Sequence, residues 1–309
     1  RNVAPCSAMA KAMAEQGATL RLSAERVDRA LGEGAAHSPL DDADRSEQVA
    51  AWLSELETQY RYLIYATSGD DSHWSRRCIR QADRVLIVVD GAASARMTPE
   101  IQAFQKIRGR ASAELCIVHY EAEKNRADPR AWADLCATDS VLHATLDRAE
   151  SFERLVRLVT GRGLGLVLGG GGARGFAHLG LWKALEAQGI EFDVLGGASM
   201  GAYIAALMAI GMDSEAATVN LRETFVDNNY LNDYVVPRVG LIGGRKFLRR
   251  LDEVFGDKRV EDLHIPYFCV STNLSQGESV MHRRGTLRHW LAARMAVTGI
   301  VPPVVWKPA

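Results

Sequence analysis

The stretch that decides the fold is LGLVLGGGGARGFAHLG (Leu164–Gly180), followed a few residues later by GGASMG (Gly196–Gly201). An apolar run over Leu164–Leu168 leads into four consecutive glycines and then into a helical pattern. A second apolar run, Phe192–Gly196, leads into a further helical pattern over Met200–Ile210. This order of strand, glycine loop, helix and strand predicts a βαβ unit with parallel strands.

Two turns at the carboxyl ends of these strands carry the chemistry. The glycine loop, Gly169–Gly175, collects backbone N–H groups at the start of a helix, where they can face an anion. The second turn has the form G-x-S-x-G at Gly197–Gly201 and pushes the Ser199 hydroxyl out of the fold. Because the two turns follow consecutive strands, they can place an oxyanion hole beside a nucleophile. The pair predicts a serine acyl-hydrolase site.

A dinucleotide site is the main rival interpretation, because Gly170–Gly175 also satisfies G-x-G-x-x-G. Glu191 and Asp193 follow in sequence, but they lie at the start of the second strand, whereas a ribose-binding acid belongs at its carboxyl end. The bulky Arg174 also fits poorly in a loop that must approach a pyrophosphate. A Walker loop is excluded since no Gly-Lys-Ser/Thr follows. A purely structural loop is the third alternative.

The composition is that of a soluble globular protein of two ordinary domains: 309 residues, 47% hydrophobic and 24% charged. The formal net charge of −1 gives no global field that would recruit nucleic acid, so we expect no nucleic-acid partner. The five cysteines are scattered, without a C-x-x-C pair, which favours reduced thiols in a cytosolic compartment over disulfides or zinc. We expect no metal and no cofactor.

The sequence contains no apolar run of the roughly 20 residues that a membrane-spanning helix needs. We therefore expect a cytoplasmic protein, and peripheral contact with a membrane is compatible with this pattern. The chain begins with Arg1 rather than Met, so an upstream targeting or anchoring segment stays open.

Two α/β domains are expected, a Rossmann-like domain over residues 1–160 and a second domain over residues 161–309. Continuous apolar runs in the first domain suit a parallel sheet covered on both faces. The strands expected there are Ala18–Leu22, Tyr60–Ala66, Val85–Asp90, Leu115–Tyr120 and Val141–Ala144, and the helices Ser23–Leu31 (with a Ser cap), Ser46–Thr58 and Arg148–Val159. In the second domain, beyond the βαβ unit and its helix over Ala173–Gln188, we expect helices over Ser214–Val226, Lys246–Val254 and Thr286–Val297, and strands over Tyr267–Leu274 and Ser279–His282.

The motifs together resemble the patatin-like phospholipase family, most of all its neuropathy target esterase branch. The resemblance is carried by GGGARGFAHLG (Gly170–Gly180) with the G-x-S-x-G turn, and it extends over Gly163–Pro303, including DLHIPY (Asp262–Tyr267) and GIVPP (Gly299–Pro303). WSRRCIRQAD (Trp74–Asp83) resembles the region before the catalytic domain in the same branch. The resemblance implies a three-layer α/β/α hydrolase fold for the second domain, incomplete at its C-terminus, and phospholipid or lysophospholipid esters as substrates.

The same resemblance implies the roles of individual residues. Ser199 would be the nucleophile of a Ser-Asp dyad, Gly171 and Gly172 would form the oxyanion hole, and Arg174 would help to orient it; Gly170, Gly175, Gly197 and Gly201 support the two motifs. The family's aspartate stands in an Asp-Gly-Gly or Asp-Gly-Ala motif after the proline pair, whereas Asp90-Gly91 in the first domain is the one Asp-Gly pair of this sequence. The resemblance thus implies that the base lies outside these 309 residues, which alone would be inactive.

Several alternatives stay open. One is a Ser-His-Asp triad drawn from His178, His264, His282 and His289 with Asp252, Asp257 or Asp262; no spacing among them demands it. Another is a nucleotide-binding or catalytically inactive lipid-binding module on the same βαβ unit. Two positions depart from the family pattern and concern packing: Asn273, where aspartate is frequent, and Arg294, where a small residue is usual.

Two further segments have two interpretations each. Arg76, Arg77 and Arg80 beside Trp74 fit a solvated helix face better than a patch for an anion or a lipid head group. The apolar stretches Tyr234–Ile242 and Ile300–Trp306 suit either the core or an acyl-chain groove that touches a membrane.

Overall fold

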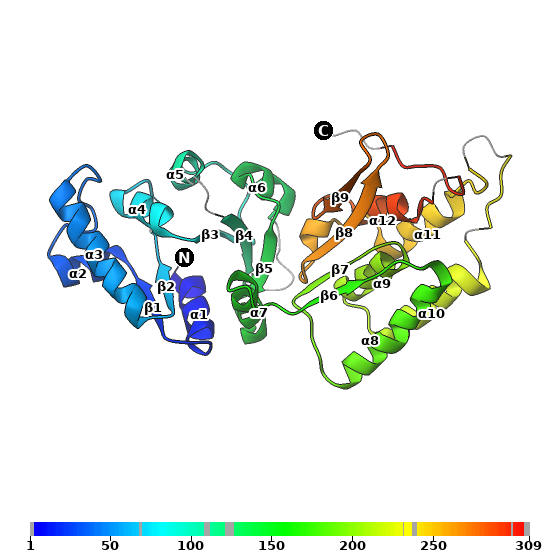
Figure 1. Cartoon of the computed structure of the whole chain (residues 1–309), viewed down its shortest axis with the longest axis horizontal. Helices are drawn as coiled ribbons and strands as arrows, with labels where there is room; N and C mark the ends of the chain where they lie inside the picture. Colours follow the sequence, from blue (N-terminus) through cyan, green and yellow to red (C-terminus); the bar gives the residue numbers. More distant parts are fainter. Residues whose placement is uncertain are drawn as a thin grey trace. The chain divides into compact units, whose positions relative to one another are not determined.

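The computed structural model describes residues 3–67, 70–107, 112–120, 127–230, 232–236, 240–297 and 299–305. It divides into two compact units, Arg1–Arg162 and Gly163–Ala309, and both are mixed α/β structures (Figure 1). The Ser68–Gly69 part of the loop after the second strand and Trp306 lie outside the described residues.

The first unit alternates strands and helices. Its strands are β1 (Thr19–Leu22), β2 (Tyr62–Tyr65), β3 (Arg84–Asp90), β4 (Ser112–His119) and β5 (Val141–Thr145). Its helices are α1 (Val3–Ala14), α2 (Ala24–Leu31), α3 (Ala43–Gln59), α4 (His73–Gln81), α5 (Pro99–Ile107), α6 (Pro129–Cys136) and α7 (Ala149–Val159). β1 pairs with β2, and β4 lies between β3 and β5, all in parallel. The expected parallel strands are confirmed.

Two details of the first unit correct the sequence analysis. Ser23 stands at the N-cap of α2 without a capping hydrogen bond. Its hydroxyl instead binds the Glu25 carboxylate, and this hydrogen bond is the largest cause of a lowered Glu25 pKa. The expected solvated face of α4 is wrong for Arg77, which is buried, because its side chain turns toward Ser38 and Ser46.

The second unit is built on one four-stranded sheet. Its strands are β6 (Gly165–Leu168), β7 (Val194–Gly197), β8 (Tyr267–Asn273) and β9 (Glu278–His282), in the order β6-β7-β8-β9. Its helical segments are η1 (Gly172–Phe176), α8 (Ala177–Ala187), α9 (Met200–Ala209), α10 (Ser214–Arg222), η2 (Glu223–Asp227), α11 (Arg245–Phe255), η3 (Val260–Asp262) and α12 (Leu287–Met295). β6, β7 and β8 are parallel, and β9 returns antiparallel after a turn at Gly277, as the sequence predicts.

The register of the sheet fixes where the two motif turns lie. Leu168, the last residue of β6, pairs with Gly197, the last residue of β7, and Gly197 pairs in turn with Cys269 of β8. The glycine loop and the G-x-S-x-G turn therefore leave the sheet side by side, at the carboxyl ends of two neighbouring strands.

Helix α9, which begins directly after Ser199, is the centre of the core. All its residues except Met208 are buried, as an apolar helix without a polar face requires. Tyr203 packs edge-on against Phe225 and Phe255, with ring centroids 5.6 and 5.5 Å away, and donates its hydroxyl to Asn220 at 2.9 Å. The helix that follows Ser199 is thus anchored in the core of the unit.

Two predicted helices of this unit are shorter than expected. The segment over Ala173–Gln188 begins as the 3-10 turn η1, and the α-helix starts only at Ala177. Gly175, within the 3-10 turn, packs against Met200. The segment over Ser214–Val226 continues after Arg222 as a wider π-type turn. That turn presents the Glu223 carboxylate to Arg250 at 2.7 Å.

All five cysteines are unpaired thiols. Within the described ranges, no helix combines the length and the apolar character that crossing a bilayer would require.

Candidate active site

Ser199 occupies a strained turn between β7 and α9. Its φ and ψ of 50° and −125° lie in a region that disfavours side chains and costs about 1–3 kcal/mol. Ser199 stands at the N-cap of α9, yet its side chain makes no capping hydrogen bond, although serine at this position usually does. The hydroxyl is therefore available for chemistry. This is the geometry of a nucleophile elbow.

The two glycines of G-x-S-x-G allow the elbow to sit directly on the end of β6. A Cβ atom at Gly201 would overlap the Leu168 carbonyl oxygen, and one at Gly197 would lie 2.7 Å from the same oxygen. Ala198 donates its backbone N–H to this oxygen at 2.9 Å. Glycine is thus required at both positions by backbone-to-backbone approach.

The glycine loop passes against the elbow on the other side. A Cβ at Gly170 would lie 3.1 Å from Ser199 Cβ, and one at Gly175 would lie 2.5 Å from Met200 Cγ. Two glycines of the loop therefore touch the two residues at the tip of the second turn. The structure brings the two motifs together, as the sequence predicts.

The amides of Gly171 and Gly172 stand at the start of the 3-10 turn. The first donor within that turn is Arg174, whose N–H reaches the Gly171 carbonyl at 3.2 Å. Like the first amides of any helix, those of Gly171 and Gly172 have no acceptor inside it. The Arg174 side chain is exposed, so within the described structure Arg174 shapes the loop through its backbone.

His178 fixes the other end of the loop. Its Nε2 lies 3.0 Å from the Gly169 carbonyl oxygen, which can only accept, so Nε2 carries the proton and donates. From the sequence alone, His178 is a candidate only for a Ser-His-Asp triad. Its position one turn into the helix after a glycine loop is the signal that fits an anchor.

Most other residues of the alternative Ser-His-Asp triad have partners of their own. His282 Nε2 lies 2.6 Å from Ser271 Oγ, its ring stacks on Trp290, and burial is the main cause that lowers its pKa to about 4. Asp252 and Asp257 both pair with Arg288. Asp262 accepts the Arg259 N–H, and His289 lines the cavity described below. His264 is exposed in the segment between η3 and β8.

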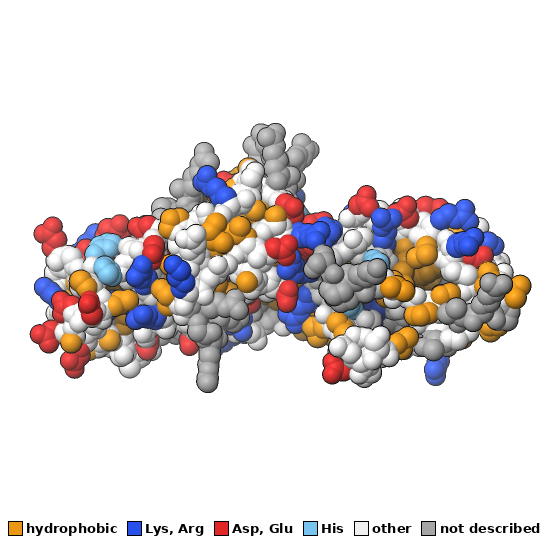
Figure 2. Space-filling view, turned by 90° about the horizontal axis from the view of Figure 1, so that it is seen from above, with side chains coloured by type: hydrophobic (Ala, Val, Ile, Leu, Met, Phe, Trp, Pro, Cys, Tyr) orange, Lys and Arg blue, Asp and Glu red, His pale blue; other side chains and the backbone are white. Residues whose placement is uncertain are grey.

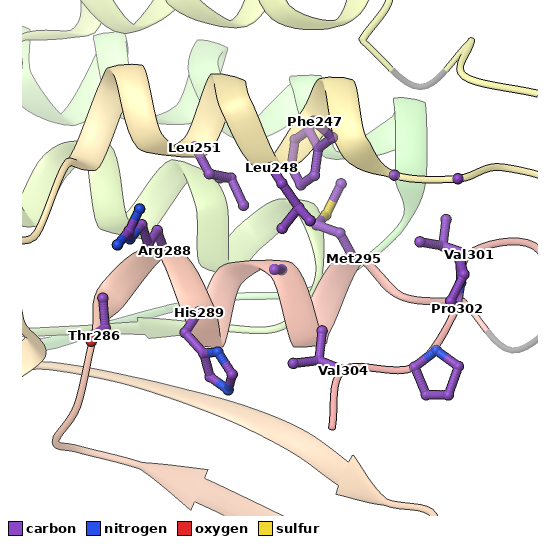
Figure 3. A pocket seen from close by; sticks show the side chains of 14 residues that line it. Phe247, Leu248, Leu251, Thr286, Arg288, His289, Met295, Val301, Pro302 and Val304 are labelled. Atoms are coloured by element: carbon purple, nitrogen blue, oxygen red, sulfur yellow. The ribbon is translucent and has the colours of Figure 1, made fainter. Parts of the chain in front are cut away.

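The hydroxyl of Ser199 faces Met295, with Oγ to Sδ at 4.0 Å. A thioether is a weak acceptor and cannot take the proton of an attacking hydroxyl. Met295 also lines a cavity of about 620 Å³ between α11, α12 and the segment 301–304 (Figure 3). Its wall is mostly apolar, with Phe247, Leu248 and Val304 among the lining side chains. Met295 therefore lies between Ser199 and an apolar cavity.

One of the two acids that a dinucleotide site would need is used elsewhere. The buried Asp193 accepts the Leu164 N–H at 2.9 Å through Oδ2. That hydrogen bond lies at the amino end of β6, the opposite edge of the sheet from the glycine loop. Asp193 therefore ties two strands together and does not face the loop.

Comparison with known proteins agrees with this geometry. Residues 166–308 match the family described as Patatin-like phospholipase, and residues 6–137 match the Neuropathy Target Esterase family P-loop like domain. The chain therefore combines a P-loop like domain of the Neuropathy Target Esterase family with a patatin-like phospholipase domain.

Two relatives show the extent of the match. Human "Patatin-like phospholipase domain-containing protein 6" is 31% identical over 319 aligned residues, which cover 93% of this chain and 23% of the relative. "Neuropathy target esterase sws" of Drosophila melanogaster is 30% identical over 319 residues, covering 93% of this chain and 22% of the relative. The chain thus spans less than a quarter of the length of these relatives.

Replacing Gly201 by alanine tests the backbone contact on which the patatin-like elbow rests. The new methyl group would overlap the Leu168 carbonyl, so we expect Gly201→Ala to lower the free energy of unfolding by about 1–3 kcal/mol. Gly180→Ala is the matched control, because a Cβ there meets nothing within 4 Å. Urea denaturation of both variants measures the difference, and equal stability of the two would contradict the contact.

Replacing Ser199 by glycine tests the strain. Glycine adopts a φ of 50° without steric cost, so Ser199→Gly should raise the free energy of unfolding by about 1 kcal/mol. A drop in stability, measured by the same denaturation, would mean that the turn is not strained.

Proposed function

We propose that this chain is the acyl-hydrolase part of an enzyme that cleaves carboxylic esters of phospholipids or lysophospholipids. The observation that carries the proposal is the contact between the Ser199 elbow and the glycine loop, at the carboxyl ends of β6 and β7. The match of residues 166–308 to the patatin-like phospholipase family supports the reaction class, and the apolar cavity beside Met295 supports a substrate with a hydrocarbon chain.

In the proposed reaction, Ser199 Oγ attacks the ester carbonyl carbon while its proton passes to a base. The carbonyl oxygen becomes an oxyanion and accepts hydrogen bonds from the backbone N–H groups of Gly171 and Gly172. The C–O bond then breaks, the leaving alcohol takes the proton, and the acyl group stays on Ser199 until water releases it. One such oxyanion donor is typically worth roughly 10²–10³ in rate.

We further propose that the base is an aspartate outside these 309 residues, completing a Ser-Asp dyad. In its support, the Ser199 hydroxyl meets the Met295 sulfur, and Asp252, Asp257 and Asp262 are engaged with arginines and a backbone amide. An ordinary aspartate, with a pKa of about 3.9, is a weak base, so desolvation next to Ser199 would have to raise its pKa.

Peripheral contact with a lipid surface belongs to the same proposal. Hydrophobic side chains gather on one face of the second unit, at the right-hand end of Figure 2. Leu248 lines the cavity and is itself half exposed. Ile300 and Val305, which flank the lining segment 301–304 in sequence, are exposed as well. In this proposal the exposed apolar side chains contact the membrane next to the cavity that would hold the acyl chain.

Ser199→Ala should abolish ester hydrolysis in the full-length protein, with a loss of at least about 10³-fold in kcat, because no other group can form the acyl-enzyme. Release of fatty acid from lysophosphatidylcholine measures the rate. The exposed Ser275 provides a control, and Ser275→Ala should retain full activity. Undiminished turnover by a folded Ser199→Ala variant would refute the assignment.

The location of the base has its own test. The 309-residue chain should bind lysophospholipid without hydrolysing it, whereas a longer chain that includes the following residues of the gene should hydrolyse it. Activity of the 309 residues alone would contradict an external base. Binding without hydrolysis in both chains would favour a lipid-binding module.

A further inference from the structure

Arg77 of α4 is a buried cation in the first unit, 8% exposed. Its Nη2 lies 3.4 Å from Ser38 Oγ and 3.5 Å from Ser46 Oγ, and its Nε has no hydrogen-bond partner. The two hydroxyls donate to the carbonyls of Ala35 and Leu40, so they offer Arg77 only lone pairs. The guanidinium is held in place but its charge is not balanced.

No acidic side chain of the described residues forms an ion pair with Arg77. Its neighbour Arg76, in contrast, makes two hydrogen bonds of 2.7 Å to Asp71. Asp42, at the start of α3, accepts the Arg45 amide instead. Burial lowers the pKa of Arg77, and no carboxylate counteracts this effect. A buried charge without a partner is costly, so an unmatched guanidinium points to a missing anion.

The position of Arg77 in the fold sharpens this argument. Ser46 lies in the first turn of α3 and Arg77 in the second turn of α4. Because β1 and β2 are parallel, α3 and α4 both begin at the carboxyl ends of these strands. This is the edge of the sheet where ligands bind in doubly wound folds. Helix N-termini carry partial positive charge, so they repel the guanidinium and attract an anion.

A second unpartnered group lies on the same face of α4. His73 precedes Arg77 by four residues, and its Nδ1 is buried without a hydrogen-bond partner. Residues four apart share a helix face, and a helical side chain leans toward the N-terminus. Two unsatisfied nitrogens therefore belong to one face of one short helix.

We propose that Arg77 binds the phosphate group of a small soluble ligand between the first turns of α3 and α4. The planar guanidinium fork matches phosphate oxygens, and helix N-termini also bind phosphate groups. This site belongs to the first unit and is independent of the proposed hydrolase.

Isothermal titration calorimetry of the whole 309-residue chain tests the site with inorganic phosphate, sn-glycerol 3-phosphate and ATP, against sodium chloride at equal ionic strength. At least one phosphate compound should bind, and Arg77→Met should weaken its binding at least about tenfold, the usual effect of losing charge-assisted hydrogen bonds. The exposed Arg80 on the same helix provides the control, and Arg80→Met should bind as the unchanged chain does. The tightest of the three probes identifies the source of the phosphate group.

Thermal unfolding gives the independent readout. Phosphate at about five times its Kd should raise Tm by about 2–4 °C in the unchanged chain and not in Arg77→Met. Without phosphate, Arg77→Met should unfold at the same or a higher temperature, whereas loss of a structural arginine would lower Tm. Should Arg77→Met fail to fold, Arg77→Lys replaces it, since it keeps the charge but loses the fork and should also bind about tenfold more weakly. Absence of binding by all three compounds, or equal binding by the Arg77 variants, overturns the proposal.

Discussion

The Leu168 carbonyl oxygen is the constraint on which the candidate site depends. It accepts the Ala198 N–H at 2.9 Å, and it lies so close to Gly197 and Gly201 that neither position has room for a Cβ. This contact presses the elbow against the end of β6. The glycine loop begins directly after Leu168, the last residue of β6. The same contact therefore sets the loop amides beside Ser199.

The strained backbone conformation of Ser199 persists because the structure on both sides of the turn holds it in place. On one side the turn continues into α9, whose buried Tyr203 is held by aromatic contacts and by Asn220. On the other side the loop is held by His178 at the Gly169 carbonyl. A rigid helix and an anchored loop thus keep a serine in a conformation that its backbone disfavours, which is typical of functional sites.

Local sequence patterns predicted much of this arrangement. Glycines at fixed spacing and an apolar run before each turn were enough to place the loop and Ser199 at the ends of neighbouring strands. The roles of Met295 and His178 were not predictable, since one depends on a contact across 96 residues and the other on the fold of the loop itself. The burial of Arg77 was missed for the same reason, because its polar neighbours Ser38 and Ser46 come from a distant segment.

The most direct test is whether Ser199 and the amides of Gly171 and Gly172 act on the same reacting group, which a covalent inhibitor can show. A crystal structure of the full-length enzyme inhibited by an alkyl phosphonate should show phosphorus bonded to Ser199 Oγ. Its phosphonyl oxygen should lie about 2.7–3.1 Å from the backbone nitrogens of Gly171 and Gly172, with the alkyl chain beside Met295. A phosphonate bonded to another residue, or an oxygen turned away from the glycine loop, would contradict the account.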